Sequence, residues 1–561
     1  MTEFVLAPAV VFFLGAALIA VLRPRARALV VLGVPWLALW AVWQLGDGVH
    51  WQTEFLGYPI DLVEADRLRR LFASVFCLMA FVGGLFGLLQ ARRHELTSAY
   101  AYAGGALGVC FAGDLISLFL FWELMAVFST VLVWAGGSEA ARRSGLRYAT
   151  LHLLGGMLLM FGIIGHLAAS GEVSVSPLSL QSMASWLIFA GLLLNAGAPP
   201  LSAWIADAYP EASASGTVFL SAFTTKTAVL VLILLFPGTP ILIPIGLFMI
   251  FYGIVYALLE NDMRRVLAYS IVNQVGFMLV GIGIGSELSI NGAAAHAFVH
   301  ILYKGLLFMS AGAVLAATDR RRLSDLGGLV QSMPVTALCG IVGALSISAF
   351  PLTSGFIAKS MISAAAADQH LAWVWYLLGA ASAGVFLHAG IKFPWFVFFQ
   401  KDSGLRPADP PWNRQAAMLL VAIACIALGC APGVLYALLP YPVDYVPYTA
   451  AHVLAQTQLL LYAGLAFFLL LPWMRRTLTI SLDLDWLYRR LLPMMAAGVL
   501  GAWDRLHANA RPVLTRYLER PLRKLYSYHQ AGGLLARTWP TGSMALWVVS
   551  LLVLLVWSGR S

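Results

Sequence analysis

The stretch Asn291–Ala316, NGAAAHAFVHILYKGLLFMSAGAVLA, is almost wholly apolar, yet it carries His296, His300 and Lys304. A helix of about this length spans the hydrocarbon core of a bilayer, roughly 30 Å. The three ionisable residues are spaced four positions apart, so they line one face of that helix. Ionisable groups inside a membrane are costly and mark paths for ions or protons. The stretch therefore predicts a membrane-spanning helix with a proton-carrying face.

The rest of the chain has the same apolar character. Of its 561 residues, 60% are hydrophobic and 11% are charged, whereas soluble domains carry roughly 25% charged residues. This composition excludes a soluble enzyme, a disordered protein and a nucleic-acid-binding protein, and the net charge of +9 comes from basic loops. The 5 cysteines lie in apolar stretches without a CxxC pair. We therefore expect no disulfide framework, no metal site and no cofactor held by this chain.

Sixteen apolar stretches are candidate transmembrane helices, which predicts an all-α polytopic membrane protein. They cover residues 4–22, 28–45, 70–90, 98–112, 114–135, 147–169, 185–208, 214–235, 239–259, 264–285, 291–316, 335–366, 371–399, 413–435, 450–474 and 542–558. Arginine and lysine cluster in the loops that follow odd-numbered spans. By the positive-inside rule these loops are cytoplasmic, so both termini are expected on the outer side.

We expect the chain to divide into six parts. These are N-terminal helices at 1–97, a core in two parts at 98–259 and 260–400, C-terminal helices at 401–476, a basic segment at 477–541 and a last span at 542–561. The segment 477–541 mixes aromatic and basic residues, which predicts one or two amphipathic helices on the cytoplasmic surface. Pro493, Pro512 and Pro521 argue against one unbroken helix. Contact with anionic lipid and a brace against a neighbouring subunit explain this segment equally well.

More ionisable residues lie inside the predicted spans, namely Glu123, His152, Lys226, Lys359 and Lys392. A charge at mid-bilayer costs at least ~2.5–3.5 kcal/mol, so these groups must be paired, hydrated or neutral. A single buried histidine is usually a hydrogen-bonded packing residue, but three ionisable groups on one helix face favour a proton path. The HxxxH spacing of His296 and His300 has no third ligand nearby, which disfavours a metal or haem site.

Two predicted spans contain prolines where a helix should break. They are Pro199 and Pro200 in LLLNAGAPPLSAW and Pro351 in ISAFPLTSGFIAK. A proline inside a membrane helix frees carbonyls that protein or water must satisfy. The breaks are five spans apart, as are the lysines at 226 and 392, and an odd offset inverts the orientation of the second unit. Although prolines are common in membrane helices, the matched lysines favour two inverted five-helix repeats around a transport path.

Several long motifs follow one another along the chain. They are FLFWELMAVFS around Glu123, PPLSAWIADAYPEAS at 199–213, SAFTTKTAV around Lys226, ENDMRRVLAYSIVNQVGFM at 260–278, HAFVHILYKGLLFMSAG at 296–312, DLGGLVQSMP at 325–334 and SAFPLTSGFIAKSMI at 348–362. Over residues 60–400 the chain resembles the antiporter-like subunits of the respiratory complex I superfamily and of Mrp-type cation/proton antiporters, and it is most similar to the D-type Mrp subunits.

The resemblance implies a proton pathway through residues that match the motifs of the family. By motif these are Glu123, Lys226, His296, His300, Lys304 and Lys359, and we add Lys392 and His152 on their chemistry. The chain departs from the family pattern at Asn195, where a lysine is expected, and at Ser202, where a histidine is expected. Glu123 then lacks its usual ion-pair partner. Either Glu123 carries the proton itself, toward His152 or Lys226, or this input path is weakened.

The sequence therefore favours a proton-translocating membrane subunit of a multi-subunit cation/proton antiporter in a bacterial inner membrane, with sodium as a second candidate ion. The charges would act on one another through a low dielectric and pass protons along the row. Two alternatives stay open. One is a membrane-arm subunit of a complex I-like NADH–quinone oxidoreductase, with its redox centres in partner chains. The other is a structural subunit with a degraded pathway. The expected partners are other integral membrane subunits and the lipid bilayer, without nucleic acid.

Overall fold

The computed structural model describes residues 6–472, 483–530, 532–534 and 540–558. The chain divides into two units, of which the larger ends at Asp485 and the smaller begins at Trp486. Within the described residues, 12 helices are long and apolar enough to cross a membrane, and three further apolar helices are shorter. The chain is thus a mostly helical, multi-pass membrane protein. Each of the sixteen predicted stretches falls on one or more helices, but the number of membrane crossings stays a prediction.

The first part of the larger unit contains a hairpin that the sequence analysis missed. The elements are α1 (Pro8–Val21), α2 (Pro24–Gln44), β1 (Gly48–Phe55), β2 (Tyr58–Ala65), α3 (Arg67–Gly87), α4 (Arg93–Phe111), α5 (Leu115–Trp134) and α6 (Glu139–Ser170). The antiparallel strands β1 and β2 turn at Leu56 and Gly57, which both have positive φ. Two central residues of this kind are typical of a tight hairpin turn. The available sequence signal for this hairpin was the polar run ahead of Gly57. That run is too short to span a membrane.

The middle of the larger unit holds the helices that carry most of the buried charges. They are α7 (Met183–Ala196), α8 (Trp204–Ala208), η1 (Tyr209–Glu211), α9 (Ala214–Ala222), α10 (Thr224–Leu235), α11 (Leu242–Leu259), α12 (Met263–Ile284) and α13 (Glu287–Thr318). Several of the helices begin at side chains that cap free amides. Asp114 accepts from the amides of Ile116 and Ser117 at the start of α5, and Asp262 does the same at the start of α12.

The last part of the larger unit runs from a second broken helix to a stretch of wide π-helical turns. Its elements are η2 (Leu323–Asp325), η3 (Leu329–Gln331), α14 (Pro334–Ile347), α15 (Ser354–Asp368), α16 (Ala372–Val385), η4 (Phe386–Lys392), η5 (Trp395–Phe399), α17 (Trp412–Cys430), α18 (Pro432–Tyr436) and α19 (Ala450–Leu470). Both η4 and η5 are π-helical. π-Helical turns are rare and are frequent at functional sites.

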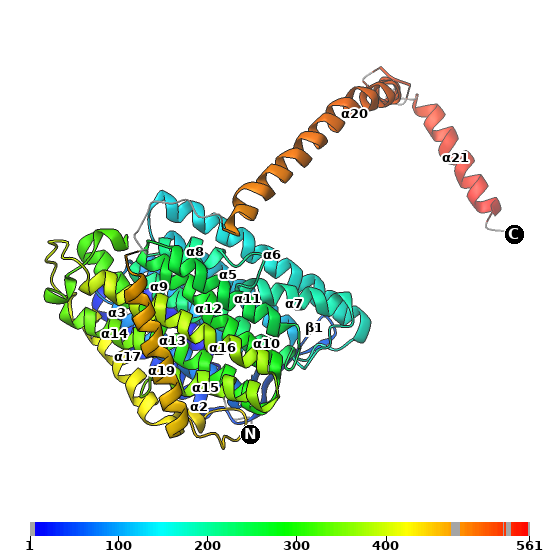
Figure 1. Cartoon of the computed structure of the whole chain (residues 1–561). Coiled ribbons are helices and arrows are strands. Elements are labelled where there is room, and N and C mark those ends of the chain that lie inside the picture. Colours follow the sequence, from blue (N-terminus) through cyan, green and yellow to red (C-terminus); the bar gives the residue numbers. More distant parts are fainter. Residues whose placement is uncertain (1–5, 473–482, 531, 535–539, 559–561) are drawn as a thin grey trace. The chain divides into compact units, whose positions relative to one another are not determined.

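Helix α13 lies at the centre of the larger unit. It packs against α3, α9, α12, α14, α15 and α17, and the helices of this unit run side by side as one bundle (Figure 1). Every residue from Ser289 to Val314 is buried. A helix that is apolar on all sides belongs in an interior, so the predicted ladder of histidines and lysine on α13 lies deep inside the protein.

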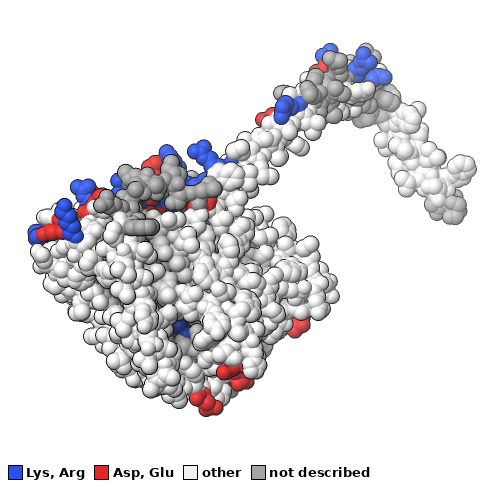
Figure 2. Space-filling model, in the orientation of Figure 1, with Lys and Arg blue, Asp and Glu red and all other residues white. Residues whose placement is uncertain are grey.

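Charged side chains gather along two opposite edges of the larger unit, and a nearly uncharged belt lies between them (Figure 2). This is the surface that a bilayer requires, because a charge in the hydrocarbon region is costly. One edge is the arginine-rich face at the starts of α6 and α12 and the end of α13, and we call it the basic face. Its residues include Arg142, Arg265 and Arg321.

The smaller unit contains one long helix that corrects a prediction. Its elements are η6 (Leu487–Leu491), α20 (Leu492–His529) and α21 (Thr541–Ser558). The expectation that Pro493, Pro512 and Pro521 interrupt this segment is wrong, because α20 is continuous through all three positions. Pro493 lies in the first turn, where its missing amide costs no helical bond. Around Pro521 the side chains are exposed, so water can satisfy the freed carbonyl. Residues 477–482 and 535–539 of the predicted segment lie outside the described residues.

Candidate functional site

Three lysines lie buried in the larger unit and form one interacting row. Lys226 on α10 and Lys304 on α13 are 0% exposed, and Lys359 on α15 is 4% exposed. Helix α13, which carries Lys304, packs against both α10 and α15, the helices that carry the other two lysines. An ammonium at this depth needs polar partners. The structure provides them mainly from the main chain.

Lys226 holds the end of a short helix. Helix α9 ends at Ala222, and α10 begins at Thr224 after a single intervening residue. Lys226 Nζ donates to the carbonyl of Ser221 at 2.6 Å and to Thr225 Oγ1 at 3.1 Å. Carbonyls in the last turn of a helix lack an amide partner and carry partial negative charge. The C-terminal end of α9 is therefore a favourable position for an ammonium group.

Lys359 holds the end of a second broken helix in the same way. Helix α14 ends at Ile347 and α15 begins at Ser354, with Pro351 between them. Lys359 Nζ donates to the carbonyl of Ile347 at 2.6 Å and lies 4.9 Å from the ring centre of Phe277. A cation over an aromatic face is favourable, so Lys359 has both a helix end and a π-face as partners.

The histidines and the lysine of α13 line one face of that helix, as their spacing predicts. Lys304 Nζ donates to the carbonyl of Leu267 at 3.2 Å and to Ser270 Oγ. His296 Nε2 lies 3.1 Å from Gln274 Oε1 and 3.0 Å from the hydroxyl of Tyr303. Among the described residues, neither ring nitrogen of His300 has a hydrogen-bond partner. A buried imidazole with both nitrogens open is able to take or give a proton.

Glu123 lies apart from the lysine row, in a cavity of about 280 Å³ between α5 and α6. His152, Thr130 and Trp134 also line this cavity. Within the described part of the chain, Glu123 Oε1 and His152 Nε2 are both buried without a hydrogen-bond partner. The carboxylate lies against Gly156, where an added Cβ would come 1.9 Å from Oε1. The structure thus brings Glu123 and His152 to one cavity.

Asn195 packs against α6 next to the position that Glu123 contacts, and Ser202 lies in the break between α7 and α8. A Cβ on Gly155 would come 2.8 Å from Asn195 Nδ2, whereas its neighbour Gly156 faces Glu123. Asn195 Nδ2 donates to the carbonyl of Gly191 at 3.1 Å. Ser202 is 0% exposed, and its hydroxyl has no partner among the described residues. Neither residue replaces the missing lysine as a partner for Glu123.

A cluster of hydroxyl groups connects His152 to the start of α10, the helix that carries Lys226, and the sequence analysis missed it. The ring of Tyr148 lies against that of His152, with centroids 4.0 Å apart and the planes tilted by 44°, and its hydroxyl donates to Ser129 at 2.9 Å. The same hydroxyl lies 3.5 Å from Thr224 Oγ1, which lies 2.5 Å from the hydroxyl of Tyr102. The available signal was spacing, because Tyr148 precedes His152 by one helical turn.

Lys392 lies outside the row of the other three lysines. Its Nζ donates to the carbonyls of Ala257, Leu258 and Glu260 at 2.6, 2.7 and 2.6 Å. These carbonyls form the C-terminal end of α11, next to the basic face. Lys392 therefore occupies a helix end at the edge of the bundle, whereas the sequence analysis placed it in the pathway on chemistry alone.

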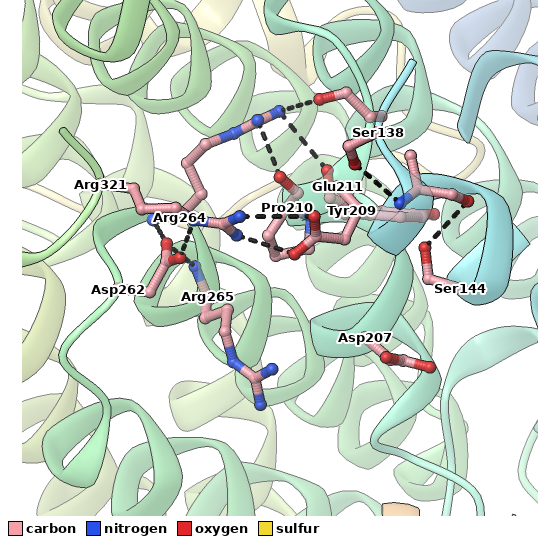
Figure 3. A network of polar contacts seen from close by, with 12 residues as sticks. Ser138, Ser144, Asp207, Tyr209, Pro210, Glu211, Asp262, Arg264, Arg265 and Arg321 are labelled. Carbon is pink, nitrogen blue, oxygen red and sulfur yellow. Dashed lines mark hydrogen bonds and ion pairs between the residues drawn. The ribbon is translucent and has the colours of Figure 1, made fainter. Parts of the chain in front are cut away.

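A network of ion pairs ties helix ends together at the basic face (Figure 3). Arg264 is 2% exposed and donates to the carbonyls of Pro210 and Ala212 at 2.8 and 2.9 Å. Arg321 pairs with Glu211 at 2.9 Å and with Asp262. The turn after α8 is thereby held to the start of α12. This anchors the segment that follows the broken helix to the basic face.

The described residues contain no group of three or more His, Cys, Asp or Glu side chains that could hold a metal ion. The described site gathers buried lysines and histidines in an apolar interior.

Comparisons with known proteins agree with this geometry. Residues 112–385 match the family described as "NADH:quinone oxidoreductase/Mrp antiporter, TM". The D-type subunit of the Na(+)/H(+) antiporter of Alkalihalophilus pseudofirmus is 29% identical over 366 residues, which cover 60% of this chain and 71% of the relative. The N-type subunit of the NADH-quinone oxidoreductase of Desulforudis audaxviator is 31% identical over 381 residues, which cover 61% of this chain and 72% of the relative.

The fold also has a close counterpart among solved structures. A chain of the Mrp complex from Dietzia sp. DQ12-45-1b superposes with a TM-score of 0.69 at 20% identity, covering 83% of this chain and 98% of that chain. At this level of identity the likeness shows the fold alone.

Proposed function

Because this chain belongs to the NADH:quinone oxidoreductase/Mrp antiporter family, we propose that it is a proton-translocating subunit of a multi-subunit cation/proton antiporter. The buried row Lys226–Lys304–Lys359 carries the proton, and His296 and His300 on α13 supply further proton-binding sites. Sodium is the second ion that we propose for the complex. The similarity to the D-type subunit of an Na(+)/H(+) antiporter supports this choice.

A single observation carries the proposal. Each of the three buried ammonium groups donates a hydrogen bond to a main-chain carbonyl, and the helices that carry them pack against one another. The distances from Nζ to carbonyl oxygen are 2.6 Å for Lys226, 3.2 Å for Lys304 and 2.6 Å for Lys359. The carbonyls stabilise the charged form, whereas the apolar surroundings and the neighbouring ammonium groups oppose it. Such a balance lets a lysine lose and regain a proton.

The proton moves along the row because the charges repel one another. In a low dielectric the repulsion between two ammonium groups is several-fold stronger than in water. A proton that arrives on one lysine therefore raises the cost of charge on its neighbour and drives that proton onward. The breaks ahead of Lys359 and ahead of Lys226 leave polar main chain at the level of the row, where water can enter.

The test is removal of single lysines from the working complex. We expect Lys304→Ala and Lys226→Ala to lower sodium-dependent proton flux in everted vesicles by at least about tenfold, which corresponds to ~1.4 kcal/mol in a barrier. Assembly, followed by native gel electrophoresis, should be unchanged. Lys401→Ala is the matched control, because Lys401 is exposed. Wild-type flux in both buried-lysine variants would exclude the pathway.

A second candidate function is a membrane-arm subunit of a redox-driven pump. The similarity to the N-type subunit of an NADH-quinone oxidoreductase favours it. The same row of lysines would carry protons in an antiporter and in a redox-driven pump, so the partner chains distinguish the two functions. Purification of the tagged chain from its native membrane followed by mass spectrometry separates the two. Small hydrophobic partners indicate an antiporter, and soluble flavin or iron–sulfur subunits indicate a redox pump.

The arrangement in the membrane is part of the proposal. We place the basic face in the cytoplasm, both termini outside and the chain in a bacterial inner membrane, because arginine-rich loops stay on the cytoplasmic side. We also propose that the helices α4–α10 and α11–η5 are inverted repeats, each with one broken helix. Accessibility of single cysteines to a membrane-impermeant reagent on either side tests the orientation.

Glu123 and His152 form the input end in this proposal. They share a lateral cavity, and contacts run from His152 through Tyr148 to Thr224 and Tyr102. Thr224 begins α10, the helix that carries Lys226. Helix α20, with its basic and apolar residues, is proposed to lie on the cytoplasmic surface. Anionic lipid and a neighbouring subunit remain equal candidates for what it contacts.

A further inference from the structure

The larger unit buries an acidic residue that the proposed pathway does not use. Asp483 lies close to the end of this unit and is 8% exposed. Its Oδ1 accepts from the hydroxyl of Tyr252 on α11 at 2.5 Å, and its Oδ2 accepts from the hydroxyl of Tyr269 on α12. These partners lie 231 and 214 residues earlier in the chain. We call Asp483 and the two tyrosine hydroxyls the Asp483 clasp.

The Asp483 clasp is supported by a guanidinium and a third aromatic ring. Arg265 Nη2 donates to the hydroxyl of Tyr269 at 3.3 Å, so this hydroxyl joins a guanidinium to a carboxylate. Hydrogen bonds to charged groups are stronger than bonds between neutral groups. The ring of Tyr256 packs on both partners of Asp483, with centroids 4.7 Å from Tyr252 and 5.5 Å from Tyr269. The carboxylate is therefore held in a well-packed aromatic pocket.

The two helices that the clasp joins lie in very close contact. A Cβ added to Gly253 of α11 would come 2.7 Å from the carbonyl oxygen of Tyr269. Asn273 Nδ2 of α12 donates to the carbonyl of Ile250 of α11 at 2.9 Å. Tyr269 and Asn273 are four residues apart, so they share the face of α12 that meets α11. Closely packed interiors transmit a displacement rather than absorb it, so a shift at Tyr269 moves α12.

The same stretch of α12 holds the ammonium of Lys304. Lys304 Nζ donates to the carbonyl of Leu267 at 3.2 Å and to Ser270 Oγ. Ser270 directly follows Tyr269 in the chain, and Leu267 precedes Tyr269 by two residues. The strength of a hydrogen bond depends steeply on its distance and angle. The position of α12 therefore decides how well Lys304 is held.

We propose that Asp483 is a positioning residue of the proton row. Its bonds to Tyr252 and Tyr269 fix α12 against α11, and this keeps the carbonyl of Leu267 and the hydroxyl of Ser270 in place against Lys304. Asp483 acts through α12 and does not itself carry the proton. This inference rests on the proposed function of the row, because it gives Asp483 a part in that function.

A second acid in the chain shows what a purely structural anchor looks like. Asp409 Oδ1 accepts from Thr336 Oγ1 at 2.7 Å, and its Oδ2 accepts from the amide of Val335 at 3.1 Å. These bonds tie a loop to the start of α14, and α14 supplies no partner to Lys304. Asp409 is therefore the matched control for Asp483.

The experiment is a double-mutant cycle on proton flux in everted vesicles, with each flux divided by the amount of assembled complex. We expect Asp483→Ala and Ser270→Ala each to lower flux by at least about threefold. The double variant should have the flux of the weaker single variant, because both changes remove the same support of Lys304. Losses that multiply in the double variant would overturn the proposal, and so would wild-type flux in Asp483→Ala.

The control cycle combines Asp409→Ala with Ser270→Ala. Any loss of flux in Asp409→Ala should multiply with that of Ser270→Ala, because the two residues support different parts of the bundle. A control cycle as non-additive as the Asp483 cycle would overturn the proposal, since the coupling to Ser270 would then not be specific to the clasp.

A conservative variant covers the case in which Asp483→Ala does not assemble. Tyr269→Phe keeps the packed ring and removes only the hydroxyl that reaches Asp483, so the same cycle is measured with Tyr269→Phe and Ser270→Ala. Losses that multiply there would also overturn the proposal. Failure of the proton row is distinguishable, because wild-type flux in Lys304→Ala would exclude the row itself. Reduced flux in Lys304→Ala together with multiplying losses for Asp483 and Ser270 would exclude only the clasp.

Discussion

The two helix breaks that contain prolines bind the carbonyls at the preceding helix end with different kinds of donor. At the end of α7, the carbonyl of Leu194 accepts from Trp204 Nε1 at 3.0 Å and from the amide of Gly197 at 3.1 Å. At the end of α14, the ammonium of Lys359 donates to the carbonyl of Ile347 at 2.6 Å. One break is closed by neutral groups and the other by a charge.

A helix break in a membrane therefore requires hydrogen-bond donors for its carbonyls, but these donors can be neutral or charged. Unsatisfied carbonyls cost several kcal/mol in hydrocarbon, about the same whether an indole or an ammonium is absent. The break near Asn195 is therefore stable without a lysine, and Glu123 is left in its cavity without the partner that the family pattern supplies. The charge of the donor at a break therefore reflects function rather than stability, and substitutions at each break test its effect on proton flux.

The largest effect is expected from removal of the charge at the second break. Lys359→Met leaves the carbonyl of Ile347 without its donor and interrupts the lysine row, so we expect proton flux to be lost. The unsatisfied carbonyl should lower the free energy of unfolding by ~1–3 kcal/mol, measured by thermal unfolding of the purified complex. Ser202→Ala, at the first break, is the control and should be near wild type in both measurements. Normal flux in Lys359→Met would show that the two breaks do not differ in function.

An intermediate effect is expected from adding a charge at the first break. Asn195→Lys places an ammonium beside α6, where Gly155 and Gly156 leave room for contact with Glu123. The new pair should hold Glu123 ionised and change the rate of proton flux in vesicles, and the double variant with Glu123→Gln should lose that change. An unchanged rate in a working complex would mean that the input path does not run through this end.

The smallest effect is expected from removal of one hydroxyl between the two ends. Tyr148→Phe keeps the ring against His152 but loses the hydrogen bond to Ser129 and the contact with Thr224. We expect a loss of ~0.5–1.5 kcal/mol in unfolding free energy and a decrease of a few-fold in proton flux, with Tyr376→Phe, an exposed tyrosine, as the control. Flux equal to that of the control would show that the Glu123 cavity does not feed Lys226 by this route.

Much of the site could be predicted because long apolar stretches of sequence identify membrane-spanning helices. The family resemblance and the antiporter reading were confirmed, and the buried positions of the α13 face follow from a spacing of four residues. The hairpin around Gly57 was missed because two short strands leave no span-length signal. The continuity of α20 was missed because the rule against proline assumes that the freed carbonyl has no water, whereas residues around Pro521 are exposed.

The partners of each charge could not be predicted, because they come from distant parts of the chain. Lys392 was grouped with the lysine row by residue type, but its carbonyl partners lie 132 to 135 residues earlier, at the end of α11. The hydroxyls near His152 come from four different helices for the same reason. Spacing along one helix reports which side chains share a face, and it says nothing about which helix that face meets.

The sequence alone was enough to show that this protein spans a membrane, that its spans contain ionisable groups and where its helices break. The reason is that burial in lipid restricts the composition of every position. Only the tertiary structure decided which charges interact as a row, which helix end holds each ammonium and which acid is left without a cation. Those outcomes depend on main-chain carbonyls, which every residue carries and which only the packing of helices brings to a particular side chain.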